Sequence, residues 1–147
     1  MKRRATFALA AMPFAAHAQA PWPNRPIRLV VPFAPGGTTD VVGRIVAEKL
    51  AARLGQPVVV ENRAGAGATI GAQQVARAEP DGLVLLVSSS TSHGVSPALY
   101  PNIPYDALRD FTHVGMIARS PSVLLVNPAS PLRTLADFAT AARAAGA

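Results

Sequence analysis

The strand, turn and helix that follow the first two dozen residues constrain the fold more than any other part of the chain. Residues 27–33 form a continuous apolar run, which is typical of a strand buried on both faces of a parallel sheet. A Pro/Gly turn follows, and Thr38 or Thr39 is expected to cap a helix that ends at about Leu54, with Gly55 just beyond it. Because this unit brings backbone N–H groups and the positive end of a helix dipole to one point, it favours binding of a small anion, either a phosphate or a carboxylate.

Strands and helices continue to alternate along the chain. The apolar face of the first helix is expected to consist of Val41, Val42, Ile45, Val46 and Leu50. The remaining predicted elements are strands over 57–61, 83–88, 114–118 and 123–126, helices over 70–78 and from 135 to about 145, a short helical turn at 97–100, and Thr134 as the cap of the last helix. This order predicts an α/β fold with a mainly parallel sheet flanked by helices.

The first 18 residues are predicted to be a secretory signal peptide. A basic segment at residues 2–4 precedes an apolar run over residues 5–16, and an Ala-x-Ala cleavage signal ends at Ala18. A second such signal ends at Ala20, where the following proline disfavours cleavage. The apolar run is shorter than the roughly 18 residues that a bilayer span needs. We therefore expect cleavage after Ala18 and export of residues 19–147 to a bacterial periplasm.

Charge and composition exclude several classes of function. The whole chain has a formal charge of +6, and removing the three leader cations leaves 11 Lys and Arg against 8 Asp and Glu. These cations are scattered and are not interleaved with aromatic residues, so nucleic-acid binding is not predicted. The chain has no cysteine, which excludes disulfides, thiol redox chemistry and thiolate metal sites. His93 and His113 lack metal-ligand spacing with any acidic residue, and we predict neither a metal nor a cofactor.

Two predicted loops lie where α/β proteins bind ligands, beyond the carboxyl ends of the strands. One follows the strand at 27–33, and the other, which is rich in hydroxyl groups, follows the strand at 83–88. Backbone amides and the hydroxyls of Thr38 and Thr39 would cradle a carboxylate, whereas Asp40 is expected to complement the helix dipole. The candidate ligand-binding residues are Phe33, Ala34, Pro35, Gly36, Gly37, Thr38, Thr39 and Asp40 in the first loop and Ser89, Ser90, Thr91, Ser92 and His93 in the second.

Enzymatic interpretations have less support in the sequence. The first loop lacks the Lys-Ser/Thr ending of a P-loop, so nucleoside triphosphate chemistry is not predicted. Residues 65–71 resemble a loose dinucleotide fingerprint, but a Rossmann fold places its glycines after the first strand. The serines before His93 suggest a hydrolase, yet the sequence has no Gly-x-Ser-x-Gly elbow and no carboxylate positioned to orient this histidine. We predict that the protein is not an enzyme, with a dinucleotide-binding α/β enzyme fragment as the alternative.

Several motifs occur in order along essentially the whole exported chain: Trp22–Asp40, Leu54–Gly67, Ala78–Gly82, Pro97–Pro101, Pro104–Asp106, Arg109–Phe111 and Leu125–Pro128. Together they resemble the periplasmic substrate-binding proteins of tripartite tricarboxylate transporters, often called the Bug family. The resemblance implies a two-lobed receptor, monomeric at full length, that closes on a small carboxylated solute and presents it to membrane permease subunits. It also implies that the loops matching residues 33–40 and 88–93 hold the ligand's carboxylate, partly through backbone amides and ordered water.

The resemblance also predicts that the chain is an N-terminal fragment. The family has a second lobe and a return of the chain to the first lobe, and these 147 residues contain no counterpart of either. We therefore expect residues 19–147 to form the first periplasmic-binding-protein-like lobe of a solute receptor. A truncated remnant that does not bind ligand is the further alternative.

Overall fold

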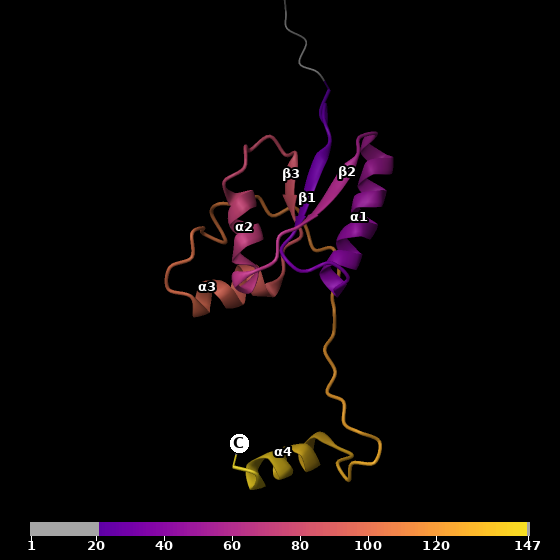
Figure 1. The fold of residues 1–147 in the computed structure, drawn as a ribbon, viewed down its shortest axis with the longest axis vertical. Helices are drawn as coiled ribbons and strands as arrows, with labels where there is room; N and C mark the ends of the chain where they lie inside the picture. Colours follow the sequence, from indigo (N-terminus) through magenta and orange to yellow (C-terminus); the bar gives the residue numbers. More distant parts are fainter. Residues whose placement is uncertain (1–20, 147) are drawn as a thin grey trace, which may run out of the picture. The chain divides into compact units, whose positions relative to one another are not determined.

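The computed structural model describes residues 21–146, so the predicted signal peptide and its cleavage site lie outside the described residues. The chain divides into two compact units, an N-terminal unit up to Val114 and a C-terminal unit from Gly115 (Figure 1). Among the described residues, no helix combines the length and the apolar character that crossing a membrane requires.

A three-stranded parallel sheet forms the centre of the N-terminal unit. Its strands are β1 (Ile27–Val31), β2 (Val58–Asn62) and β3 (Val84–Leu86), in the order β2-β1-β3. β1 lies in the middle and pairs in parallel with both neighbours. The predicted parallel α/β arrangement is therefore confirmed, although β1 ends two residues before the predicted limit and β3 is shorter than expected.

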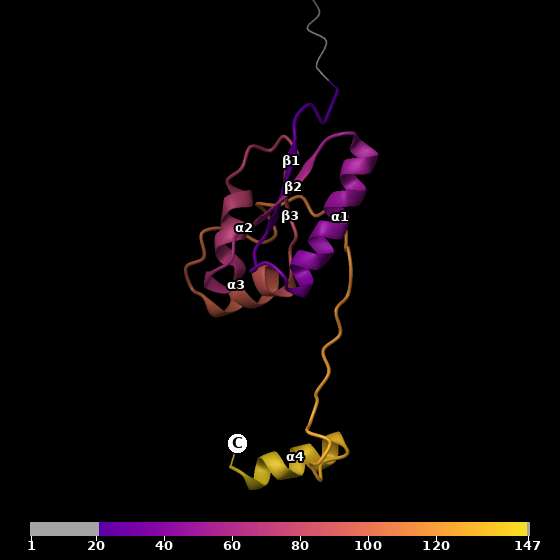
Figure 2. The same cartoon turned by 45° about the vertical axis from the view of Figure 1, so that its right-hand side comes forward.

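Side chains of the sheet alternate between two apolar layers. In the register, Leu29 of β1 lies between Val60 of β2 and Leu85 of β3, and all three side chains belong to one core cluster together with Ala47 of α1 (Thr38–Leu54). The opposite face of the sheet packs against α2 (Thr69–Ala76), where Leu86 contacts the cluster around Ala72. The two helices thus cover opposite faces of the sheet (Figures 1 and 2).

The predicted apolar face of α1 is only partly buried. Val41 and Ile45 are 49% and 54% exposed, whereas the buried positions of the helix are Asp40, Gly43 and Ala47. The reason is the close approach of helix and sheet, because a Cβ atom at Gly43 would lie 3.0 Å from a methyl group of Val31. Small residues make this contact, and the larger side chains of Val41 and Ile45 remain exposed.

The segments after β2 and β3 are compact turns. After β2, the short 3₁₀ turn η1 (Ala66–Ala68) has three successive residues with positive φ and leads directly into α2. After β3, the polar run forms one wide helical turn, η2 (Thr91–Val95), which continues into α3 (Ser96–Leu99). The short helical turn predicted at 97–100 is therefore confirmed, with its start one residue earlier.

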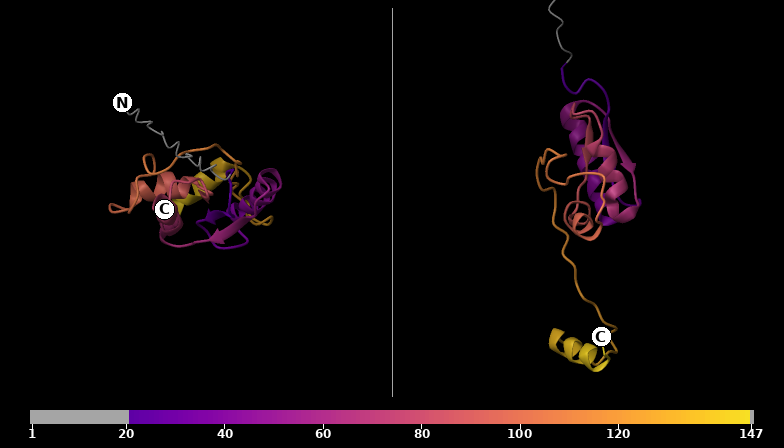
Figure 3. Two further views of the ribbon diagram at one scale, coloured as in Figure 1. Left: turned by 90° about the horizontal axis from the view of Figure 1, so that it is seen from above. Right: turned by 90° about the vertical axis from the view of Figure 1, so that its left-hand side faces the viewer.

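The C-terminal unit contains one helix, α4 (Leu135–Ala144), preceded by a segment without regular structure (Figure 3). Thr134 caps this helix as predicted, because its hydroxyl accepts from the N–H of Asp137 and the Asp137 carboxylate accepts from the N–H of Thr134. The strands predicted at 114–118 and 123–126 are wrong: this segment is exposed and pairs with no strand of the described sheet. A strand requires hydrogen bonds to a neighbouring strand, which local apolar pattern cannot supply.

Candidate functional site

The three loops that follow the parallel strands lie at one edge of the sheet (Figure 1). Two of them, after β1 and β3, are the predicted ligand loops. The third, after β2, contains the glycines that resemble a dinucleotide fingerprint. Side-chain hydrogen bonds connect these segments: Asn62 at the end of β2 donates to the carbonyl of Phe33 (3.1 Å), and Ser96 donates to the carbonyl of Gly67 (2.6 Å). Hydrogen bonds therefore connect the three loops at this edge of the sheet.

The carboxylate of Asp40 fixes the shape of the first loop. Asp40 lies in the first turn of α1, is 3% exposed and accepts from the N–H of Gly36 (2.9 Å), from Nε of Arg44 (3.0 Å) and from Nδ2 of Asn62 (2.9 Å). The hydrogen bond from Arg44 is the largest cause of a strongly lowered pKa for this carboxyl group, followed by those from Gly36 and Asn62. Asp40 is therefore an ionised anchor that ties the turn, the helix and β2 together.

The N-terminus of α1 is not capped by a threonine, contrary to the prediction. Gly37 is the N-cap residue and provides no side-chain hydrogen bond, while Thr38 and Thr39 are the first two residues of the helix. The cap position moves to Gly37 because Asp40 reaches back to the N–H of Gly36 and fixes the turn there. The N–H groups of the first turn therefore have no side-chain cap, and they lie beside the exposed Thr38 and the half-buried Thr39.

The second loop is organised around His93. Nδ1 of its ring lies 2.9 Å from Oγ of Ser88 and 3.0 Å from Oγ of Ser92. Ser92 is buried, and its carbonyl accepts a hydrogen bond from the hydroxyl of Tyr105. The ring of Phe111 lies 4.7 Å from the His93 ring, centroid to centroid. Ser88, Ser92 and Phe111 therefore hold this imidazole in one orientation, while Ser88 and Ser90 remain exposed.

Burial and a second histidine lower the pKa of His93. Burial is the larger cause, and the charge of His113 acts in the same direction. The two imidazole rings meet edge to face, with their centroids 5.6 Å apart. Among the described residues, no group of three His, Cys, Asp or Glu side chains could hold a metal ion, and every buried side-chain nitrogen or oxygen has a hydrogen-bond partner. The polar groups exposed along this loop are the hydroxyls of Ser88 and Ser90.

Sequence reasoning missed two residues that organise the first loop, Arg44 and Asn62, besides Tyr105 and Phe111 at the second. Both contact Asp40, and Arg44 also contacts Asn62 through a longer hydrogen bond of 3.3 Å. Two signals could have found them. Arg44 is four residues after Asp40 on a predicted helix, which is the spacing of an ion pair. Asn62 is a polar residue at the carboxyl end of a predicted strand, where ligand sites of α/β proteins are built.

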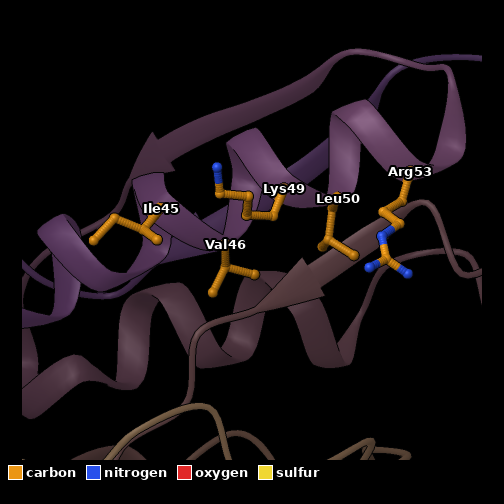
Figure 4. Close-up of a pocket in the computed structure, with 5 residues that line it drawn as sticks. All are labelled: Ile45, Val46, Lys49, Leu50 and Arg53. Carbon is orange, nitrogen blue, oxygen red and sulfur yellow. The ribbon is translucent and has the colours of Figure 1, made fainter.

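A separate groove lies farther along α1 (Figure 4). It has a volume of about 500 Å³ and is lined by Ile45, Val46, Lys49, Leu50 and Arg53. This groove is mostly apolar and begins two turns after the N-terminus of the helix, so it does not include the loops. We place the candidate site at the loops because convergent hydrogen-bond donors are there, whereas the groove consists largely of the uncovered apolar face of α1.

Comparison with known proteins identifies the family. The model of the tripartite tricarboxylate transporter family receptor matches residues 42–147. The chain belongs to this family. The resemblance based on the sequence motifs is therefore confirmed, and the family is one of receptors. The match covers α1 from Val42 onward and everything after it, including the second and third loops.

Individual relatives agree with this assignment. The chain is 49% identical over 115 residues to the protein BugT of Bordetella pertussis, which covers 78% of this chain and 35% of that protein. The structure of MatC from Rhodopseudomonas palustris with bound malate is 41% identical, with a TM-score of 0.74, over 83% of this chain and 42% of that one. A second R. palustris structure, with adipate, is 38% identical with a TM-score of 0.76, over 84% and 41%. The chain thus spans about two fifths of the length of these relatives.

Proposed function

We propose that residues 19–147 form the carboxylate-holding lobe of a periplasmic solute receptor for a tripartite tricarboxylate-type transporter. The observation that carries this proposal is the N-terminus of the 17-residue helix α1, which has no side-chain cap and lies at the carboxyl edge of the sheet. Such a terminus offers free N–H donors and positive potential to an anion. Family membership and the malate and adipate of two relatives support a carboxylate as that anion.

In this proposal the two loops contribute to ligand binding in different ways. The N–H groups and hydroxyls of Thr38 and Thr39 donate to a ligand carboxylate, and the loop from Phe33 to Gly37 brings backbone close to it. Asp40 lines the same loop, but its oxygens are occupied by Gly36, Arg44 and Asn62, so it acts by positioning the turn. The loop from Ser89 to His93 supplies the opposite wall with hydroxyl donors.

Dicarboxylates are the ligand class that this proposal favours. Malate and adipate each carry two carboxylates, and a cradle of backbone amides recognises one of them irrespective of the rest of the molecule. The second carboxylate would be read by parts of the receptor outside this lobe. The predicted leader at residues 1–18 supports a periplasmic location, and the family name supports membrane permease subunits as the partners that receive the solute.

Binding of malate and adipate to residues 19–147 tests the proposal. We expect a rise in melting temperature and a calorimetric heat with these dicarboxylates, and no response to their neutral diamides, because ligand binding to the native state raises its stability. Replacement of both Thr38 and Thr39 by valine should weaken malate binding at least about a hundredfold, since hydrogen bonds to charged groups contribute about 1.5–3 kcal/mol each and about 1.4 kcal/mol is a tenfold change in Kd. Thr140→Val on α4 is the matched control, because it removes a hydroxyl that bonds only within its own helix.

Two outcomes would contradict the proposal. A melting-temperature rise with nicotinamide dinucleotides instead of dicarboxylates would favour the enzyme alternative. A cooperative melt that no carboxylate shifts would mean that this chain does not bind ligand by itself, as expected for the truncated remnant.

A further inference from the structure

One nitrogen of the His93 ring is shared by two serine hydroxyls. Nδ1 lies within hydrogen-bond distance of Oγ of both Ser88 and Ser92, at 2.9 and 3.0 Å. A neutral imidazole nitrogen carries either one lone pair or one N–H, so it cannot accept from both hydroxyls at once. The two serines must therefore make different hydrogen bonds, and their other contacts decide which bond each one makes.

Ser92 is already committed to the backbone. Its buried hydroxyl donates to the carbonyl of Ser89 (3.1 Å) and accepts from the N–H of the same residue (3.2 Å). Ser88 is exposed, and its hydroxyl bonds to the ring of His93 in the part of the chain that the structure describes. With a neutral ring whose proton is on Nε2, the hydroxyl of Ser88 therefore donates to Nδ1 of His93.

Protonation of His93 reverses this hydrogen bond. An imidazolium has N–H on both nitrogens, so Nδ1 becomes a donor and Oγ of Ser88 becomes the acceptor. The hydroxyl proton of Ser88 is then free to donate to a group in the cleft. A positive charge appears at the same edge of the loop. Both changes strengthen the interaction with a bound anion.

The surroundings of His93 lower its pKa, through burial first and the charge of His113 second, and so disfavour the protonated ring. The elements packed against η2 are η1 and α3, and neither carries a titratable side chain. The loop after α3 brings His113 edge to face with His93, and it brings Tyr105, whose pKa is raised by burial and whose hydroxyl stays protonated. The charged residues of this loop are Asp106, Arg109 and Asp110. The carboxylate of Asp106 lies 3.8 Å from the guanidinium of Arg109 and accepts hydrogen bonds from backbone N–H groups.

We propose that carboxylate binding at the second loop is coupled to the uptake of one proton by His93, so that the receptor binds its ligand more tightly as the pH falls. This inference rests on the proposed function of the same site. A bound carboxylate favours the imidazolium, and by linkage the imidazolium raises the affinity for the carboxylate by the same factor. His93 is in this sense a positioning residue, because it acts on the ligand through the hydroxyl of Ser88 and through its charge.

Calorimetry with malate tests this coupling. We expect the Kd of residues 19–147 to fall by up to about tenfold per pH unit below neutrality, which is the limit for the uptake of one proton. Titrations at one pH in two buffers of different ionisation enthalpy should report uptake of close to one proton per malate bound. His93→Asn keeps a hydrogen-bonding group near the position of Nδ1 but cannot be protonated, and it should abolish both effects. Any protonation of malate itself affects both proteins equally and cancels in the comparison.

His113→Gln is the matched control. It removes the neighbouring charge that lowers the pKa of His93 while leaving Ser88 and Ser92 in place. The pH dependence should persist in this variant and move to higher pH. Circular dichroism of both variants establishes that they are folded, and the two-buffer titration of the unchanged chain needs no variant at all.

The outcomes separate this inference from the proposed function. If malate binds with the same pH dependence in the unchanged chain and in His93→Asn, and without proton uptake, the coupling is wrong and the receptor function stands. If malate produces no heat at pH 7.5 or at pH 6, the receptor function of this chain is wrong, and the coupling falls with it.

Discussion

Replacing Gly71 by alanine tests the close packing that frames the candidate site. Gly71 lies in α2, and a Cβ atom there would be 2.8 Å from Cβ of Pro32 and 3.0 Å from the carbonyl oxygen of Arg63. Pro32 follows β1 and Arg63 follows β2, so the added methyl group pushes against the start of two of the three loops. These neighbours include backbone atoms, which cannot move aside by changing a rotamer.

The expected magnitude follows from two opposing effects. Alanine is favoured over glycine within a helix by about 1 kcal/mol. Overpacking typically costs about 1–3 kcal/mol, and contacts with backbone belong to the upper part of that range. The net free energy of unfolding should therefore fall by about 1–2 kcal/mol. For a unit of this size, each kcal/mol corresponds to a fall in melting temperature of about 4–8 °C.

Urea unfolding followed by tryptophan fluorescence is a suitable assay. Trp22 is the single tryptophan of the chain, and its indole N–H donates to the carbonyl of Asp81 within the N-terminal unit (2.9 Å). Gly94→Ala is the control, because it lies in η2 and its Cβ would meet no atom within 4 Å. If Gly71→Ala proves as stable as Gly94→Ala, the close approach of α2 to the two loops is refuted.

Two further predictions concern an ion pair and a helix cap. Arg28 binds Glu61 through two hydrogen bonds of 2.7 and 2.8 Å, and this pairing is the main cause that lowers the pKa of Glu61 from 4.5 to about 2. Because the pKa of Glu61 is lower in the folded state, the stabilisation from this pair is present above about pH 4.5 and is lost as the pH falls toward 2. The urea midpoint of Glu61→Gln should therefore fall less between pH 5 and pH 3 than the midpoint of the unchanged chain. An equal fall in both proteins would contradict the pairing. Thr134→Ala removes the capping box of α4 and should destabilise that helix by about 1 kcal/mol, measured as faster amide hydrogen exchange in residues 135–144, with Thr140→Val as the comparison.

Local sequence signals predicted the elements whose ends are determined locally. The helix α1 ends at Leu54, as predicted, because Gly55, which adopts the left-handed conformation, follows it. Its start at Thr38 lies one or two residues before the position that a threonine cap would give. The apolar run of β1 likewise identified the central strand. The strands predicted at 114–118 and 123–126 have equally apolar sequences, but a strand depends on a neighbour, and the described part of the chain provides none for them.

The location of the candidate site could be predicted from the sequence, but its hydrogen-bond network could not. Strand order alone brought the loops after β1 and β3 to the same edge of the sheet. The roles of single residues depend on contacts between segments distant in the chain. Asn62 reaches Asp40 across 22 positions and Tyr105 reaches Ser92 across 13, and no local pattern indicates either bond. Which of the thirteen predicted residues contact a ligand stays a prediction.

The hydrogen bonds at this edge explain why an anion is the ligand that it would favour. Several acceptors near the loops are used within the protein: the oxygens of Asp40 receive three hydrogen bonds, and the carbonyls of Phe33 and Ser92 receive one each from a side chain. The first turn of α1 has no side-chain cap, so its N–H groups are still available as donors, together with the exposed hydroxyls beside them. A neutral polar ligand needs both donors and acceptors from its site, whereas a carboxylate needs donors alone. The same side chains that hold the loops in place therefore also support the proposal that the ligand is an anion.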